Sequence, residues 1–440
     1  MSTSTQDMVR PGPCVDLYYY DGETHQKQCF PTTQNTKYVQ QFQNLTGGSS
    51  VFTIPPQMGI QDVVLEMGFP ALTGTLTGLA LPRGWGYALI KQVSFRYGGS
   101  SQYFLTGDQL LQNALRRQPS RSSANDILTL GGQYADAAST NGTTNGVASN
   151  NLATAQTALV VLTLPHSIPS GVGKAHPFPS DLLTQQIQVT VELFPVNQIW
   201  STVTNGGVPP TSLSFGQFQV QQVILNNQGD ALARRVDMAN NAYAFPAEFV
   251  QQKQTIVAAS LNSTTSPQEV VLTGFRSGEV KALQVWLTRS TETALNSAAS
   301  GPTANLTNTV YDPFKWYLPS AIQMSYAGDI YARYDYSSSL IWNLINGNKA
   351  PVVDNLDIAV NSGANPTPTA FLSQWVELPF AQTCVDEDSH NTLVHGKPIT
   401  NGIVNLTITP PSSQTDWVVN VSYVYNTTLL MSQGTCDFVF

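Results

Sequence analysis

Charged residues are scarce in this chain. Asp, Glu, Lys and Arg make up 11% of its 440 residues, against about 25% in an ordinary soluble domain. A surface with so few charges associates readily with itself. The composition therefore fits two kinds of protein: one with a neutral polar surface in a secreted or crowded setting, and one whose surface is covered by identical neighbours.

Basic residues are also few. Lys and Arg total 20, and the net charge is −8. Nucleic-acid-binding proteins usually carry a basic stripe, whereas the densest basic cluster here is Arg116, Arg117 and Arg121, with no aromatic residue among them. Sequence-specific nucleic-acid recognition is therefore excluded as the main function.

Cysteine and long apolar runs are scarce too. Cys14 with Cys29, and Cys384 with Cys436, could form disulfides, but the spacing does not decide this, and four cysteines are too few for a disulfide scaffold.

The first residues lack the apolar core of a signal peptide, and no run is long enough to span a bilayer. We expect a soluble protein made in the cytosol. We also expect no glycosylation at the sequons of Asn44, Asn141, Asn262, Asn305, Asn405, Asn420 and Asn426.

One stretch occurs twice. Val93–Leu115 recurs 229 positions later as Ile322–Leu344, in the order strand, turn with Gly99 or Gly328, aromatic strand, amphipathic segment. A repeat of such long period with two copies predicts two similar domains. Four more segments recur in the same order at offsets from 200 to 217, namely 38–45 with 249–261, 159–167 with 376–384, 180–193 with 396–408, and 218–228 with 416–430. In the last two, Ile187 is placed on Ile403 and Ile224 on Val424.

Short segments rich in Val, Ile and Phe, separated by Gly and Pro, predict β-strands throughout. Asp108 is a suitable N-cap for a helix over 108–115, and its counterpart is predicted over 337–345. Segments 117–157, 290–309 and 346–370 are rich in Ser, Thr, Ala and Asn and are predicted to be loops.

Each half has about eight short strands, which is typical of a jelly roll with two sheets. We therefore predict an all-β chain with two tandem eight-stranded jelly rolls and short helices in the loops. The predicted divisions are an N-terminal arm (1–37), a first jelly roll (38–228), a helical linker (229–248) and a second jelly roll (249–440).

Three segments resemble a known family. LIKQVSFRYGGSSQY (89–103), the stretch 218–254 and the last strand, which ends near Phe440, are similar to the double jelly-roll major capsid proteins of icosahedral double-stranded DNA viruses. That family includes proteins of large eukaryotic DNA viruses, polinton-like viruses and virophages. The better-known members have Asp and Glu where this chain has Asn226, Asn227 and Gln228, so the virus group stays open.

The resemblance implies a structural protein that forms homotrimers, whose six rolls give a pseudo-hexameric capsomer. Such capsomers tile the virion shell and are synthesised and assembled inside the host cell. The implied partners are further copies of the chain, minor capsid or cement proteins and penton proteins. An internal membrane can lie nearby, although the chain has no transmembrane segment. No enzymatic activity and no cofactor are implied.

One segment could carry chemistry. A thiol nucleophile or a metal site needs a Cys/His pair beside carboxylates, and such residues occur at Cys384, Asp386, Glu387, Asp388, His390 and His395. The alternative is that this segment is a polar loop between two strands without a chemical role. The corresponding loop of the first half has His166 and His176 but no Cys or acid cluster. SGVGKAH (170–176) lacks the first Gly of a phosphate loop and has Ala175 where Ser or Thr is required. We therefore expect no catalytic, cofactor-binding or metal site.

Aromatic residues allow one further function. We expect the tryptophans to pack in the core, namely Trp85, Trp286, Trp316, Trp342, Trp375 and Trp417. If they instead lined a groove with acids, the chain would be a tandem jelly-roll carbohydrate-binding (lectin-like) or receptor-attachment protein. An enzyme on this scaffold ranks third, because no convergent acid–base set is visible.

Overall fold

The structure is a computed structural model. It describes residues 33–54, 60–98, 102–116, 118, 120–162, 180, 183–203, 206–225, 243–296, 309–335, 352–359, 364–380, 397–399 and 403–439.

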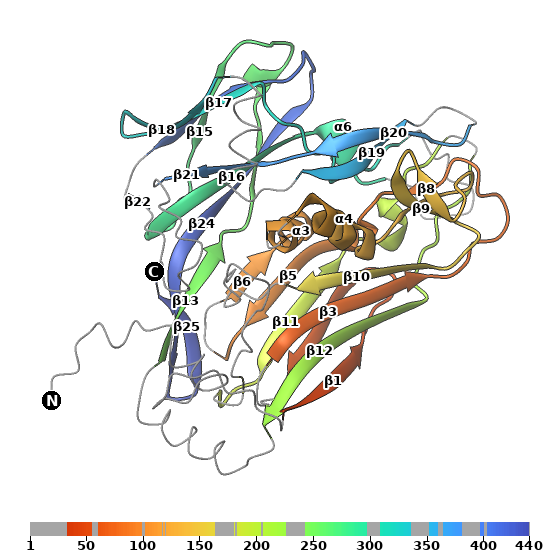
Figure 1. The fold of residues 1–440 in the computed structure, drawn as a ribbon, viewed down its shortest axis with the longest axis horizontal. Helices are drawn as coiled ribbons and strands as arrows, with labels where there is room; N and C mark the ends of the chain where they lie inside the picture. The colour runs from red at the N-terminus through yellow and green to blue at the C-terminus, as the bar shows by residue number, and fades with distance from the viewer. Residues whose placement is uncertain are drawn as a thin grey trace.

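The first half of the chain forms two four-stranded antiparallel sheets that face each other (Figure 1). One sheet has the order β1 (Thr33–Gln41), β12 (Phe215–Leu225), β3 (Ile60–Phe69), β10 (Gln156–Leu162). The other has the order β2 (Gly48–Ile54), β11 (Ile187–Leu193), β5 (Ile90–Arg96), β6 (Gln102–Leu105). Residues alternate along β10 and β11 between the buried and the outer face, as expected for strands with one face in a core.

The second half repeats this arrangement. One sheet contains β13 (Tyr243–Val250), β24 (Trp417–Ser432), β16 (Glu279–Arg289), β21 (Val376–Pro379), with β14 (Gln254–Val257) and β25 (Thr435–Val439) beside β24 and β22 (Lys397–Pro398) beside β16. The facing sheet contains β15 (Gln268–Leu272), β23 (Val404–Thr409), β17 (Ala321–Tyr326), β18 (Asp329–Tyr334). Strand for strand, the order of both sheets is the same in the two halves, which confirms the predicted pair of eight-stranded jelly rolls.

The sequence repeat holds at the level of strand register. Val93 pairs with Leu105 across β5 and β6, and Ile322 pairs with Tyr334 across β17 and β18. Both partners are displaced by the predicted 229 positions. In the second hairpin, Ala327 and Gly328 have φ of 53° and 90°, the positive values that a tight two-residue turn requires. Gly99, predicted to serve the same turn in the first hairpin, lies outside the described residues.

Two predicted equivalences are wrong. Val39 pairs with Gln219, and Val250, the residue 211 positions after Val39, pairs with Val424, so the counterpart of Val424 is Gln219 and not Ile224. The other equivalence is wrong by a single residue. Val189 pairs with Phe95, and Leu406 pairs with Met324, the residue 229 positions after Phe95. This register makes Ile187 the counterpart of Val404 and not of Ile403. A shift of one residue moves a side chain to the other face of a sheet, and Ile403 is accordingly 57% exposed.

The helix predicted over 108–115 is confirmed as α3 (Gly107–Arg116), whereas the loop predicted over 117–157 is wrong. That segment contains α4 (Arg121–Leu130) and the strands β7 (Tyr134–Asp136), β8 (Gly142–Thr144) and β9 (Val147–Asn151), which form a small sheet with β4 (Ala80–Leu81). Ser120 and Ser123 form a capping box that starts α4. Short polar side chains therefore supply caps and turns here.

The other two predicted loops are corrected in part. Within 346–370, β19 (Val353–Ala359) pairs with β20 (Thr367–Ser373). Within 290–309, one helical turn, α6 (Ser290–Thr293), follows β16, and 297–308 lie outside the described residues. So does the helix predicted over 337–345.

Two strands begin inside segments predicted to be non-strand. β1 begins at Thr33, within the predicted arm, and β13 begins at Tyr243, within the predicted linker. Residues 1–32 and 226–242 lie outside the described part of the chain. The boundaries of the four divisions stay predictions.

The two rolls share one hydrophobic core. It includes Phe52 and Phe218 of the first roll, whose rings stack with centroids 4.6 Å apart, and Trp316 and Trp375 of the second, which meet edge to face. A smaller cluster joins Tyr134 and Val147 to Leu356 and Ile358 of the second half. Because apolar burial is the main favourable term in folding, the rolls are expected to fold as one unit.

Candidate functional site: the junction between the two rolls

The segments considered for chemistry lie outside the described residues. This holds for residues 381–396, with Cys384 and both histidines, and for residues 163–179. Among the described residues no group of His, Cys, Asp and Glu could hold a metal ion. Cys436 is buried and free, and burial raises the pKa of its thiol. No described helix is long and apolar enough to cross a membrane.

The tryptophans pack in the core as predicted. Trp85, Trp286, Trp316, Trp375 and Trp417 are each at most 1% exposed, and Trp342 lies outside the described residues. Trp200 is equally buried and contacts Phe69, with ring centroids 5.2 Å apart. It was missed because it follows the short helix η3 (Val196–Ile199) and not a strand.

Two arginines of the cluster noted in the sequence, Arg116 and Arg121, contact the second half of the chain, and Arg117 lies outside the described residues. Arg116 ends α3, and its guanidinium lies 3.1 Å from Glu248 of β13 and 2.9 Å from Glu377 of β21. Glu248 also pairs with Lys281 of β16. Burial alone raises the pKa of Glu248, but Lys281 and Arg116 together outweigh it and hold that pKa well below its usual range. The carboxylate is therefore charged and fixes α3 against the second roll.

The start of α3 makes a second set of contacts. The amide of Gln109 donates to the Gln251 carbonyl oxygen at 2.8 Å and to Ser422 Oγ at 2.7 Å. Asp108 forms an ion pair with Lys253 at 2.6 Å. Because a buried polar group without a partner is costly, these pairings favour one relative placement of the two rolls.

The helix α4 holds the β19–β20 hairpin. Asn125 donates to Asp354 Oδ2 at 2.6 Å, and its own Oδ1 accepts from the Asp354 backbone N–H at 2.9 Å. Arg121 pairs with the same carboxylate. The buried Arg83 donates to the Asp354 carbonyl oxygen and to Thr129. Burial lowers the pKa of Arg83 to about 10.

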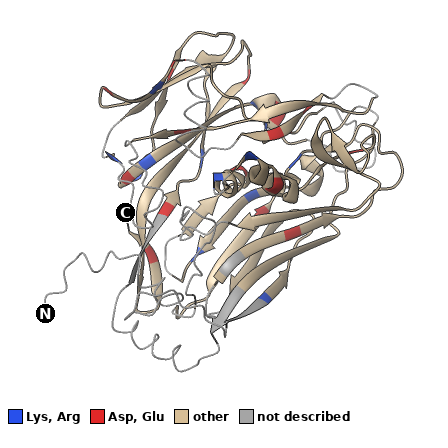
Figure 2. Cartoon of the chain, viewed as in Figure 1, with Lys and Arg blue, Asp and Glu red and all other residues tan. Residues whose placement is uncertain are grey.

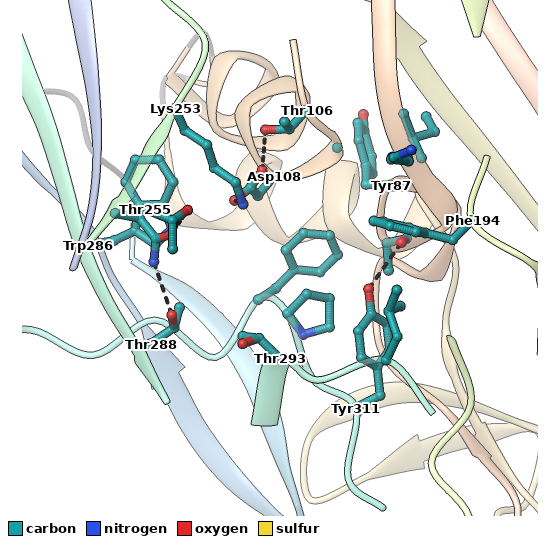
Figure 3. Close-up of a pocket in the computed structure, with 18 of the residues that line it drawn as sticks. Tyr87, Thr106, Asp108, Phe194, Lys253, Thr255, Trp286, Thr288, Thr293 and Tyr311 are labelled. Atoms are coloured by element: carbon teal, nitrogen blue, oxygen red, sulfur yellow. Dashed lines mark hydrogen bonds and ion pairs between the residues drawn. The ribbon is translucent and has the colours of Figure 1, made fainter. Parts of the chain in front are cut away.

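A cavity of about 280 Å³ lies between the rolls (Figure 3). The acid that lines it, Asp108, accepts a hydrogen bond from Thr106 and pairs with Lys253. Asn420 donates to Thr288 at 3.0 Å, and Tyr311 donates to the Ala88 carbonyl oxygen at 3.2 Å. These polar groups of the lining therefore have protein partners.

Asp312, which was not predicted from the sequence, is a buried carboxyl with a raised pKa. It is 1% exposed, and burial raises its pKa to about 8, with Glu292 adding to the effect and Lys315 opposing it. Perturbed carboxyls mark active sites when they line a cleft. Asp312 is enclosed by protein, where Asn355 donates to it at 3.4 Å, and this indicates a structural role.

No protein-family model and no curated protein matches the sequence, but solved structures match nearly the whole chain. The PBCV-1 virus capsid matches with a TM-score of 0.60 and 12% identity over 93% of this chain and 97% of that chain. The Sputnik virophage structure matches with 0.54 and 12% over 92% and 88%. The mavirus major capsid protein matches with 0.53 and 11% over 94% and 91%. The chain therefore has the double jelly-roll fold that it shares with these capsid structures.

Proposed function

We propose that the chain is the major capsid protein of an icosahedral double-stranded DNA virus. The observation that carries the proposal is the likeness of both rolls together to capsid structures over more than nine-tenths of the chain. The buried junction supports it, because a building block must hold its two rolls at a fixed angle. In this function the chain acts by assembly and not by turnover.

The functional unit we propose is a homotrimer. Three chains bring six rolls of the same topology together, and such a ring can occupy a near-hexagonal position in a lattice. Neighbouring trimers, minor capsid or cement proteins and penton proteins are its proposed partners, in a virion assembled inside the host cell. The 11% charged composition fits a surface largely covered by copies of itself.

Native mass measurement with electron microscopy tests the proposal. We expect a particle of three times the chain mass with a near-hexagonal outline. A monomer at all concentrations up to those used for assembly would contradict it. The carbohydrate-binding alternative needs accessible aromatic side chains, but the tryptophans in the described part of the chain are buried, so no observation favours it.

A further inference from the structure

Three charged side chains from separate segments of the second half meet at one point. Figure 2 shows few charged residues on the sheets of the two rolls, yet the ammonium of Lys315 lies 2.6 Å from Asp357 Oδ1 and 2.7 Å from Glu292 Oε1. Glu292 belongs to α6, Asp357 to β19, and Lys315 to the segment that precedes β17. One primary amine therefore contacts two carboxylates.

The amine and one of the carboxylates are shielded from water. The side chains of Lys315 and Glu292 are 6% and 10% exposed, whereas that of Asp357 is 42% exposed. The Lys315 ammonium also lies 5.4 Å from the ring centroids of Tyr317 and Phe371. Surroundings of low polarity favour charged groups less than water does. The neutral forms of this amine and its partner are therefore easier to reach than at an exposed ion pair.

The backbone holds these groups in place. The N–H of Asp312 donates to the Glu292 carbonyl oxygen at 2.7 Å, and the N–H of Lys315 donates to the Asp312 carbonyl oxygen at 3.4 Å. The Tyr317 hydroxyl donates to the Glu292 carboxylate at 2.9 Å, and Asp357 is fixed by the pairing of β19 with β20. Well-oriented intramolecular groups react as if at effective concentrations of about 10⁵–10⁸ M. At such concentrations an amine and a carboxyl group can condense to an amide in the presence of water.

We propose that Lys315 and Asp357 join in an isopeptide bond, with Glu292 as the catalytic residue that carries a proton. The bond forms between Lys315 Nζ and Asp357 Cγ, which lies one covalent bond, about 1.2 Å, beyond the contacted oxygen. The reaction takes place within one chain, so it goes beyond the proposed function and does not depend on it.

The reaction balances without a co-reactant. Burial alone lowers the pKa of Lys315, but hydrogen bonds to Asp357 and Glu292 outweigh it and raise that pKa, so the reaction starts from an ammonium and a carboxylate. One ammonium proton passes to Asp357 Oδ1, and the lone pair of the neutral amine attacks Cγ. Glu292 accepts a second proton from the nitrogen and returns it to Oδ1, whose bond to Cγ breaks as one water molecule leaves. The third proton stays on the amide nitrogen.

The bond attaches the β19–β20 hairpin covalently to the segment before β17. Asp354 at the start of the same hairpin is held by Arg121 and Asn125 of the first half. The covalent link therefore lies next to the place where the two halves of the chain meet, and it persists when the chain is unfolded.

Peptide mapping of the denatured full-length chain by mass spectrometry tests the inference. We expect a branched peptide that contains Lys315 and Asp357 and is lighter than its two linear components by one water molecule. Lys315→Arg keeps a cation but has no primary amine, so we expect only linear peptides from it. A wild-type chain that yields only linear peptides for both residues has an ion pair there, and the inference is overturned.

Glu292→Gln tests the proton carrier. General acid–base catalysis typically contributes about 100-fold or more to a rate, so we expect the branched peptide to accumulate at least that much more slowly in a time course after cell-free synthesis. Accumulation at the wild-type rate would show that Glu292 does not carry the proton.

Lys253 and Asp108 provide a control within the same sample. They form a lysine–aspartate pair at the same 2.6 Å, but the Lys253 side chain is 28% exposed and contacts no second carboxylate among the described residues. We expect both residues in linear peptides. A link there as complete as the one between Lys315 and Asp357 would overturn the role of Glu292, even if Glu292→Gln fails to fold.

Discussion

The sheets β1–β12–β3–β10 and β13–β24–β16–β21 have the same strand order but differ in burial. Every residue of β24 from Trp417 to Tyr425 is buried, and so is every residue of β16 from Ala282 to Thr288. β12 and β3, by contrast, keep half-buried or exposed residues on their outer face. One sheet lies inside the molecule because the first roll covers it, and the other lies at the surface.

The outer faces of the covered and the open sheet also carry different polar residues. The covered face has small polar groups with partners, such as Ser422, which accepts from Gln109, and Asn420, which donates to Thr288. The open face has long glutamines, such as Gln217, which is half-buried, and Gln221, which is exposed. Buried polar groups need defined partners, whereas glutamines at a surface can bind water or a second chain. The same position in a repeated fold therefore carries a different residue according to what covers it.

Equivalent valines provide the strongest test of this comparison. Val250→Lys puts an unpaired charge into the covered face and is expected to cost about 4 kcal/mol or more in free energy of unfolding, or to prevent folding. Val39→Lys changes the equivalent position of the open face, and we expect a change within about 0.5 kcal/mol for the monomer. Urea unfolding of both variants in dilute solution measures the difference. Equal losses would show that the two faces are equally buried in the isolated chain.

Arg116 gives the next largest expected effect, because it connects α3 to two carboxylates of the covered sheet. Arg116→Met leaves Glu377 without this cation and weakens the pairing of Glu248. Removing one partner of a buried ion pair typically costs about 3–5 kcal/mol. Thermal unfolding measures the loss.

The control is Lys91→Met, which breaks the exposed pair with Glu192 (2.7 Å; side chains 51% and 38% exposed) and should change stability by less than about 1 kcal/mol. A small effect of Arg116→Met would mean that apolar packing alone holds the rolls together.

Much of the fold could be predicted from the sequence, because strand alternation is a local pattern and the chain shows it twice. The offset of 229 that places Val93 on Ile322 also relates their hairpin partners, Leu105 and Tyr334. The repeat could not separate Ile403 from Val404, since both residues are apolar. Only pairing with the neighbouring strands decides which of them points inward.

The junction could not be predicted, for a different physical reason. Arg116 lies 132 positions from Glu248 and 261 from Glu377, and no periodic pattern connects such residues. The strands β7, β8 and β9 could not be predicted from their composition, because Ser, Asn and Gly also occur in irregular loops. Local sequence patterns predicted the two rolls. Only the three-dimensional structure shows which residues join them.

Asp312 gives a smaller effect, which depends on pH. Its carboxyl accepts a hydrogen bond from Asn355 of β19, and its folded-state pKa of about 8 exceeds the ordinary value of 3.8. Between these values the folded chain holds a proton that the unfolded chain has released, so the free energy of unfolding falls as pH rises from about 4 to about 8.

Asp312→Asn removes this titration and should be more stable than the wild type by about 1–3 kcal/mol at pH 8, with little difference near pH 4. Unfolding curves at both pH values measure it. If the two chains keep the same difference in stability at pH 4 and pH 8, the Asp312 carboxyl is charged in the folded protein.

The smallest expected effect concerns two amides at the junction. Gln112 and Gln284 are fully buried, and their amides have no hydrogen-bond partner among the described residues. Gln284 lies in register between Ser422 and Glu377, which contact α3 on either side of Gln112, so we expect the two amides to face each other.

If both amides are unsatisfied, Gln284→Leu and Gln112→Leu should each leave stability unchanged or raise it by up to about 1 kcal/mol, and their effects should add. A water or a direct hydrogen bond between them would instead make each single change costly and the double change less costly than their sum. A double-mutant cycle by urea unfolding separates the two cases. Additive, neutral changes would mean that the junction tolerates apolar residues at both positions. Its polar groups would then fix the placement of the rolls only where they are paired.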